Sequence, residues 1–161
     1  MKKLLLTSFS LLFTMSVFAQ KVTIKSGTIV PLEAIKQVKA SNTHEGETID
    51  FRVSRDVKVG DVVAIPAGAI ARGSVYEAKR STAFGTKGRL GIKLRYVTLP
   101  SGDVVNFTSS DVYIEGKNRT PLSVVVFCFT LLPFPCGSKA VMPIGYECDA
   151  TVAGNTEITI Q

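Results

Sequence analysis

Few residues in this sequence have the types and spacing that catalysis requires. The single histidine, His44, lies in a stretch rich in Ser, Asn and Gly, and no second histidine follows at the HExxH spacing of a zinc protease. Neither a GxSxG nucleophile motif nor a phosphate-binding P-loop occurs. Glu45, Glu47 and Asp50 lack the regular ligand spacing of a calcium loop. We therefore predict a non-catalytic protein with no cofactor and no bound metal.

The three cysteines all lie in the last third of the chain. Cys128 occupies an apolar run, where a thiol behaves as a small buried hydrophobe. Cys136 and Cys148 flank a turn-rich segment and are the predicted disulfide pair. A metal site is the alternative, but no CxxC spacing supports one. Because disulfides persist only in oxidising compartments, the pairing depends on export.

Export is predicted by the first 19 residues. Lys2 and Lys3 precede an apolar run, and the small residues Val17 and Ala19 complete a signal-peptide pattern cleaved after Ala19. The alternative, a membrane anchor, needs about 20 apolar residues, and Ser and Thr interrupt this shorter run. Residues 1–19 are therefore the predicted signal peptide, and residues 20–161 form one domain that is periplasmic, outer-membrane-associated or extracellular.

The net charge does not favour nucleic acid as a partner. Of the 161 residues, 45% are hydrophobic and 20% are charged, with a formal net charge of +6. Removal of Lys2 and Lys3 lowers that charge to +4, which leaves a mildly basic domain without the clustered basic and aromatic residues of a nucleic-acid binder. The length is sufficient for one domain with its own core.

One internal stretch is nevertheless basic, since no acidic residue occurs between Glu77 and Asp103. We predict that residues 83–89 form the tip of a hairpin that could bind an envelope protein or an anionic surface component, such as lipid headgroups or acidic glycans. The candidate interaction residues in this stretch are Arg80, Phe84, Lys87, Arg89, Lys93 and Arg95. The alternative is a solvated hairpin whose charges protect strand edges from aggregation.

Residues 122–135 form the most apolar stretch after the signal peptide. It has 14 residues, is bounded by Pro121 and is broken by Pro133, so it is too short to span a membrane as a helix. It is either a buried strand that enters a turn or a loop that contacts a membrane or a partner. In the second case Phe127, Phe129 and Phe134 are its candidate contact residues.

The elements that would position these residues are short strands. Residues 48–54 and 90–96 alternate apolar and polar side chains, which is typical of half-buried antiparallel strands. Pro31–Lys39 is a helix candidate, although it could equally form a strand. Turn residues separate the strands, so we predict an all-β fold, a single antiparallel sandwich or small barrel. The further candidate strands are residues 22–25, 62–65, 69–79, 104–108, 112–115, 146–153 and 156–160.

A short pattern occurs twice, at residues 63–69 and 140–146. In each copy an apolar strand ends at a proline, Pro66 or Pro143, and a glycine follows two residues later, Gly68 or Gly145. Proline fixes φ for a tight turn and glycine permits a positive φ, so the pattern predicts a repeated strand-turn-strand unit.

The order of these motifs carries a resemblance over most of residues 20–161. From Gly27-Thr28 and Pro31-Leu32 through the two Pro-x-Gly turns and residues 85–90, the chain resembles a group of uncharacterised exported β-rich proteins of Gram-negative bacteria, especially Bacteroidetes. The turn pattern is also similar to the periplasmic β-barrel of TrbI-type components of type IV secretion channels. The resemblance implies an envelope location and a β-barrel, with no assigned chemistry.

These observations predict a non-catalytic β-domain of the cell envelope with a binding or structural role. One alternative is a membrane-associated subunit of an envelope or secretion assembly that uses residues 122–135. The other is a small ligand-binding or hydrolytic barrel, because residues distant in sequence can meet only in the fold. The partner and the oligomeric state are open at this stage.

Overall fold

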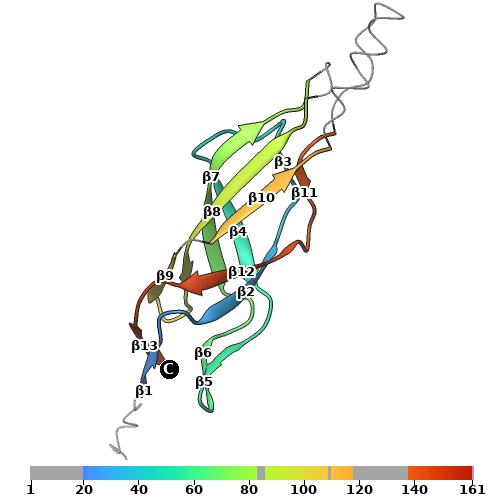
Figure 1. Ribbon diagram of the computed structural model, residues 1–161. Coiled ribbons are helices and arrows are strands. Elements are labelled where there is room, and N and C mark those ends of the chain that lie inside the picture. The colour runs from blue at the N-terminus through green and yellow to red at the C-terminus, as the bar shows by residue number, and fades with distance from the viewer. Residues whose placement is uncertain (1–19, 83–85, 109, 118–137, 161) are drawn as a thin grey trace, which may run out of the picture.

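The computed structural model describes residues 20–82, 86–108, 110–117 and 138–160, and this part of the chain is all β (Figure 1). The predicted fold class is confirmed, while the predicted signal peptide, residues 1–19, lies outside the described residues. The strands are β1 (Gln20–Ile24), β2 (Ile29–Ala34), β3 (Val38–Lys39), β4 (Thr48–Val53), β5 (Val57–Val59), β6 (Val62–Ile65), β7 (Ile70–Lys79), β8 (Arg89–Thr98), β9 (Val104–Thr108), β10 (Asp111–Glu115), β11 (Val141–Met142), β12 (Glu147–Val152) and β13 (Thr156–Ile160).

Six strands close into an antiparallel barrel. Their order is β8-β7-β4-β2-β12-β9, and β9 pairs again with β8 to complete the ring. β10 follows β9 along the same side of β8, so that Tyr96–Thr98 pair with β9 while Arg89–Lys93 pair with β10. Between the two architectures predicted from sequence, the closed barrel is therefore the correct one.

Toward the turn between β7 and β8 the ring opens. The β2–β12 ladder continues as β3–β11 in the same register, with Glu33 opposite Glu147 and Val38 opposite Met142. β2 pairs only with the second half of β4, from Phe51 onward. Beyond that point the sheet β10-β8-β7-β4 and the ribbon β3–β11 run as separate layers (Figure 1).

Alternating side chains fill the barrel. On β4, Ile49 and Phe51 are at most 1% exposed, while Asp50 and Arg52 between them are exposed. On β8 the residues at positions 90, 92 and 94 are buried in the same way, as the period of two in the sequence predicts. Exclusion of these apolar side chains from water is the main force that holds the six strands together.

The helix considered for Pro31–Lys39 is wrong, because this segment forms β2 and β3. A helix would bury Leu32, Ile35 and Val38 on one face, but Ile35 is 43% exposed. Burial instead alternates along β2, with Leu32 and Ala34 inside the barrel. The spacing of three was therefore accidental, and cross-strand pairing decides the structure.

The repeated turn forms as predicted. Gly68 and Gly145 have φ values of 88° and 74°. In both copies the glycine N–H donates to a neighbouring strand, to Val53 O or to Ala34 O, at 2.9 Å. The N–H of the next residue donates back to the proline carbonyl in each copy. The pattern is thus a structural unit that reverses the chain and attaches the turn to the barrel.

The described termini lie together at one end of the molecule. β1 pairs with β13 there, and the β5–β6 hairpin lies at the same end (Figure 1). The end of β7 and the start of β8 lie toward the opposite end, which we call the distal end (Figure 1).

Candidate interaction surface

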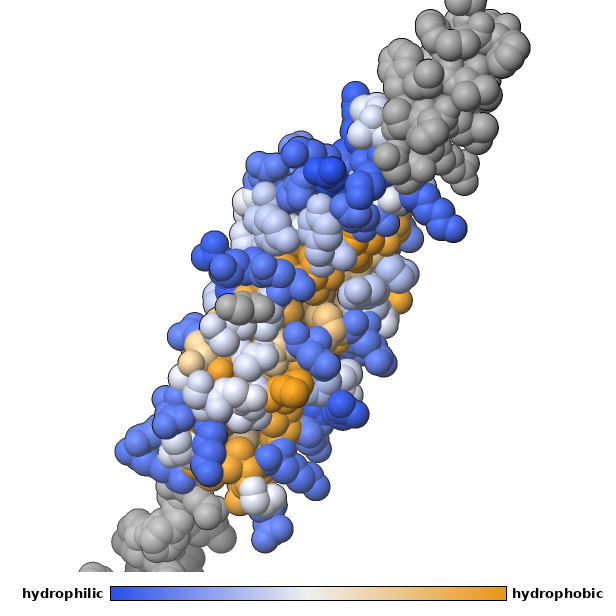
Figure 2. Space-filling view, in the orientation of Figure 1, coloured by the Kyte–Doolittle hydropathy of each residue, from blue (hydrophilic) through white to orange (hydrophobic). Residues whose placement is uncertain are grey.

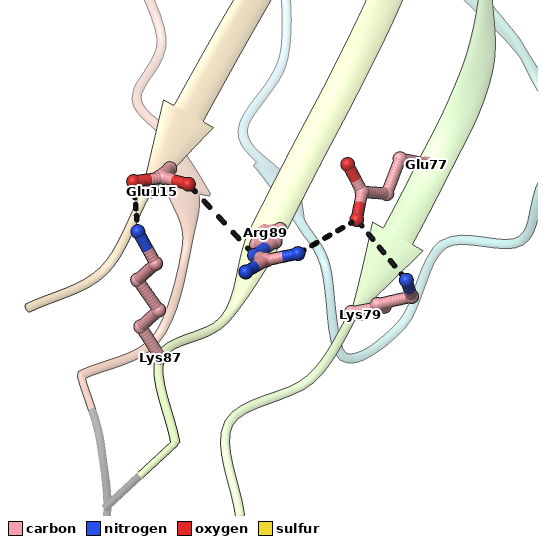
Figure 3. Close-up of polar contacts among 5 residues, drawn as sticks. All are labelled: Glu77, Lys79, Lys87, Arg89 and Glu115. Atoms are coloured by element: carbon pink, nitrogen blue, oxygen red, sulfur yellow. Dashed lines mark hydrogen bonds and ion pairs between the residues drawn. The ribbon is translucent and has the colours of Figure 1, made fainter. Parts of the chain in front are cut away.

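The hairpin of β7 and β8 positions a network of charges near the distal end (Figure 3). On one side Glu77 accepts ion pairs from Lys79 Nζ at 3.3 Å and from Arg89 Nη1 at 3.6 Å. On the other side Glu115 pairs with Lys87 and, at 3.8 Å, with Arg89 Nε. Arg89 therefore connects two carboxylates that come from β7 and β10.

Strand register explains this arrangement. Arg89 on β8 is the cross-strand neighbour of Lys79 on one side and of Glu115 on the other. Directly opposite side chains on one face of a sheet lie close enough to interact. The hydrogen bond from Lys87 is the largest influence on the pKa of Glu115 and lowers it. Burial acts to raise the pKa of Glu77, but Lys79, Tyr113 and Arg89 together outweigh burial and lower it.

The basic stretch is consequently not a basic face. Arg72 lies 3.5 Å from Asp50 of β4, and Lys93 has Asp111 of β10 as its cross-strand neighbour. In the part of the chain that the structure describes, Arg80 and Arg95 are exposed and form no ion pair. The acidic residues absent from the linear stretch are supplied by β4, β7 and β10, so the expected concentration of positive charge is largely compensated.

Two tyrosines cover the outer surface of β8 beside this network. Tyr76 lies over Gly91, where an added Cβ would be 2.5 Å from the ring carbon Cζ of Tyr76. Tyr113 is the cross-strand neighbour of Gly91 from β10. Both side chains remain close to half exposed, at 46% and 45%. The pKa of each tyrosine is raised, first by burial and then by neighbouring carboxylates that include Glu77.

Backbone hydrogen bonds join three chain segments at the distal end. Gly88 N–H donates to Ser138 O, Gly116 N–H donates to Gly88 O, and Ser138 N–H donates to Lys117 O. The contact is so close that a Cβ on Gly116 would lie 1.9 Å from Ser138 O. Lys117 and Ser138, which flank segment 118–137, therefore lie beside Gly88 at the start of β8.

Several predicted residues lie outside the described part of the chain. These are Phe84, the apolar segment 122–135 with Phe127, Phe129 and Phe134, and the cysteines Cys128 and Cys136. Cys148 is half-buried on β12 and forms no disulfide with another described residue, and burial followed by Asp149 raises the pKa of its thiol to about 11. The pairing of Cys136 with Cys148 stays a prediction.

Outside this surface, the described residues offer few features that could support catalysis or ligand binding. His44 is exposed, and its backbone N–H donates to Glu47. Open surface pockets lie beside Lys36 and Lys39 and, at the other end, beside Leu99 and Ile158. Within the described ranges no group of three or more His, Cys, Asp or Glu could hold a metal ion, and every buried side-chain nitrogen and oxygen is hydrogen-bonded. No helix among the described residues is long and apolar enough to cross a membrane.

Sequence reasoning missed Glu77 and Glu115 as partners of the basic residues, and it missed both tyrosines. The alternation of residues 111–115 places Asp111, Tyr113 and Glu115 on one exposed face. The sequence pattern does not give the register that places this face beside β8.

Comparison with known proteins adds little to this description of the surface. No protein-family model matches the chain, and no curated protein matches it. A similar solved structure is ComB10 of the Com type IV secretion system of Helicobacter pylori, with 15% sequence identity and a TM-score of 0.44. The similarity covers 85% of this chain and 90% of that chain.

Proposed function

We propose that this chain is an exported, non-catalytic β-domain of the bacterial cell envelope with a binding or structural role, and that it binds its partners through the distal end of the barrel. The observation that carries the proposal is the junction of Gly88, Lys117 and Ser138. It brings Gly88, which precedes β8, together with Lys117 and Ser138, the described residues on either side of segment 118–137, far from β1 and β13 (Figure 1).

The arrangement of the two ends supports this choice of surface. The described termini pair at one end of the barrel, so the segments at the distal end are connections between strands. At the distal end, Thr82 and Thr86 are exposed and Thr82 N–H donates to Thr86 O. Loops that project from a rigid sheet are frequent sites of recognition.

The filled interior supports a binding surface rather than an internal site. A barrel that encloses a ligand needs space between its strands, as lipocalin-like barrels provide. Here Leu32 of β2, Phe51 of β4, and Ile92 and Leu94 of β8 are at most 1% exposed and occupy the interior. The ion pairs of the outer surface account for the lowered pKa values of the two glutamates in Figure 3. The ligand-binding or hydrolytic barrel is therefore the weaker alternative.

The test combines cell fractionation with site-specific photocrosslinking in the producing bacterium. A photoreactive amino acid replaces Thr86 at the distal end or, as the matched control, Asp61 in the exposed turn between β5 and β6. We expect the protein in the envelope fraction without residues 1–19, and protein adducts from position 86 but not from position 61. Cytoplasmic protein that retains residues 1–19, or equal adducts from both positions, would contradict the proposal.

A further inference from the structure

The free edge of β10 is a second surface of the barrel, which runs from Asp111 to Glu115 and reaches the distal end there. Among the described residues, β10 is hydrogen-bonded to β8 on one side and forms no ladder on the other. Leu94 N–H donates to Ser110 O, and Gly116 N–H donates to Gly88 O, each at 2.9 Å. These two bonds direct the even-numbered residues of the strand toward β8.

The odd-numbered residues must therefore direct their backbone groups away from β8. Successive residues of an antiparallel strand present their N–H and C=O groups to opposite sides. Asp111, Tyr113 and Glu115 consequently offer these groups along the free edge, and their side chains are exposed. An edge of this kind is a template for an added strand.

The unpaired edge of β12 faces the free edge of β10 across an opening between these two strands. Ser110 Oγ accepts a hydrogen bond from Thr151 N–H at 2.8 Å, and this bond marks the point where β10 and β12 separate. On β12, Val152 N–H donates to Thr28 O. The backbone groups of Glu147 and Asp149 therefore face away from β2, toward the side of β12 that pairs with β9 only at Thr151 and Val152.

The opening has acidic margins and an apolar floor. Asp111, Glu147 and Asp149 have exposed side chains and, within the described ranges, no ion pair. Ile114 and Cys148 point to the barrel side and are half-buried against the core. Figure 2 shows hydrophobic residues exposed as a strip between hydrophilic margins on this face of the molecule.

We infer that the free edge of β10 binds an extended segment of a partner protein, in which basic residues alternate with apolar ones. This inference rests on the proposed function, since it specifies the kind of partner that a binding domain of the envelope would take. Basic side chains of the added strand lie on the outer face with Asp111, and the intervening apolar side chains cover Ile114 and Cys148. Main-chain hydrogen bonds provide affinity and the alternate side chains provide specificity.

The charge pattern disfavours a second copy of this chain as the occupant. A twofold antiparallel pairing of β10 with itself about Tyr113 would place Asp111 opposite Glu115 of the other copy. Like charges directly opposite each other destabilise a strand pair. Asp111 has Lys93 as its cross-strand neighbour, but the exposed carboxylates of Glu147 and Asp149 form no ion pair among the described residues. A basic segment gains favourable contacts with them, so charge complementarity selects a different protein.

The test uses the purified protein and a short capped peptide that alternates Lys and Val, with an alternating Glu and Val peptide as the control. Amide hydrogen exchange, read residue by residue by NMR, reports whether the free edge becomes hydrogen-bonded. We expect the Lys peptide to slow exchange at Asp111, Tyr113 and Glu115 by about tenfold or more at saturation. Equal slowing by the Glu peptide, or no slowing by either, would overturn the inference.

Two variants at one position separate backbone from side-chain effects. Tyr113→Pro removes an N–H that β8 does not use, and proline is tolerated at such edge positions. We expect it to abolish peptide protection at the flanking residues while Tyr113→Phe preserves it. Asp111→Lys, which reverses one charge, should shift the preference toward the Glu peptide.

The remaining outcomes are also decisive. Protection that appears without peptide, together with a dimer in analytical ultracentrifugation, would identify a second copy as the occupant and overturn the inference. Loss of peptide binding with intact adducts from position 86 would refute this edge alone, whereas loss of those adducts with peptide binding retained would refute the distal end alone.

Discussion

At the scale of single residues, Cys148 shows how position controls reactivity. Its thiol lies on the barrel side of β12, and burial followed by the neighbouring Asp149 raises its pKa to about 11. Because the thiolate is the reactive species, only about one thiol in a thousand is ionised at pH 8. We therefore expect this thiol to react slowly in the folded protein.

We predict that alkylation of Cys148 at pH 8 is about 100-fold slower in the folded protein than in the urea-unfolded chain. The measurement uses a Cys128→Ser, Cys136→Ser variant, in which Cys148 is the one remaining thiol. Mass spectrometry follows its alkylation over time. Similar rates in both states would show that Cys148 is not protected. Mass spectrometry of the unreduced wild-type chain separately tests the predicted pairing of Cys136 with Cys148.

Glu115 gives a prediction about pH at the same scale. Lys87 first, then Tyr113 and Arg89, lower its pKa from the ordinary value of 4.5, so the folded state favours the ionised carboxylate. A lowered pKa adds stability that is present above pH 4.5 and lost as the pH falls through the folded pKa. We expect Glu115→Gln to lower the Tm slightly at pH 7 and to leave it unchanged at pH 3.

The matched control is Glu157→Gln on β13, because Glu157 is exposed and takes part in no ion pair among the described residues. Differential scanning calorimetry across this pH range gives both Tm values. A Tm difference between wild type and Glu115→Gln that persists at pH 3 would show that the substitution acts through packing and not through charge.

At the scale of elements, the two Pro-x-Gly turns depend on backbone conformation alone. Gly68 and Gly145 have positive φ, and an added Cβ at either position would meet nothing within 4 Å. We expect Gly68→Ala and Gly145→Ala each to destabilise the protein by about 1–2 kcal/mol through strain. Gly154→Ala is the control, since it has equal space and no positive φ. Urea unfolding measures all three, and equal effects would contradict a conformational origin.

The same turns show what local sequence determines. Proline and glycine act within four residues, so the turns and the strands 62–65, 104–108 and 156–160 follow from short patterns. Segment 31–39 was ambiguous because Leu32, Ile35 and Val38 satisfy a helical spacing while Leu32 and Ala34 satisfy a strand spacing. Only pairing with β4 and β12, whose residues are far away in sequence, selects the strand.

The candidate surface also combines features that local sequence predicts with features that depend on pairing between distant strands. The exposure of Lys93 and Arg95 was predicted from alternation along one strand, and the structure confirms it. Glu115 as the partner of Lys87 and Arg89 could not be predicted, because the pair depends on the register between β10 and β8. Charge along a sequence therefore overestimates the charge of a face wherever neighbouring strands contribute the opposite sign.

At the scale of the whole molecule, closure of the ring leads us to expect that the barrel unfolds as one cooperative unit. Ser110 lies where this closure is completed, and it is the buried polar residue among the described positions, with 6% exposure. Its hydroxyl donates to Thr108 O at 2.9 Å and accepts from Thr151 N–H at 2.8 Å. It therefore connects β9 and β12 just before β10 begins.

Ser110→Ala tests this cooperativity, because it leaves the Thr151 N–H without its acceptor. An unsatisfied buried donor costs about 1–3 kcal/mol. If the ring unfolds as a unit, the denaturation midpoint falls while the m-value and the single transition are unchanged. Ser101→Ala, at an exposed turn, should change stability by about 0.5 kcal/mol or less. A separate early transition in Ser110→Ala would instead mean that β9, β10 and β12 detach from the barrel as an independent unit. The free edge of β10 would then belong to a segment that opens while the remaining strands stay folded.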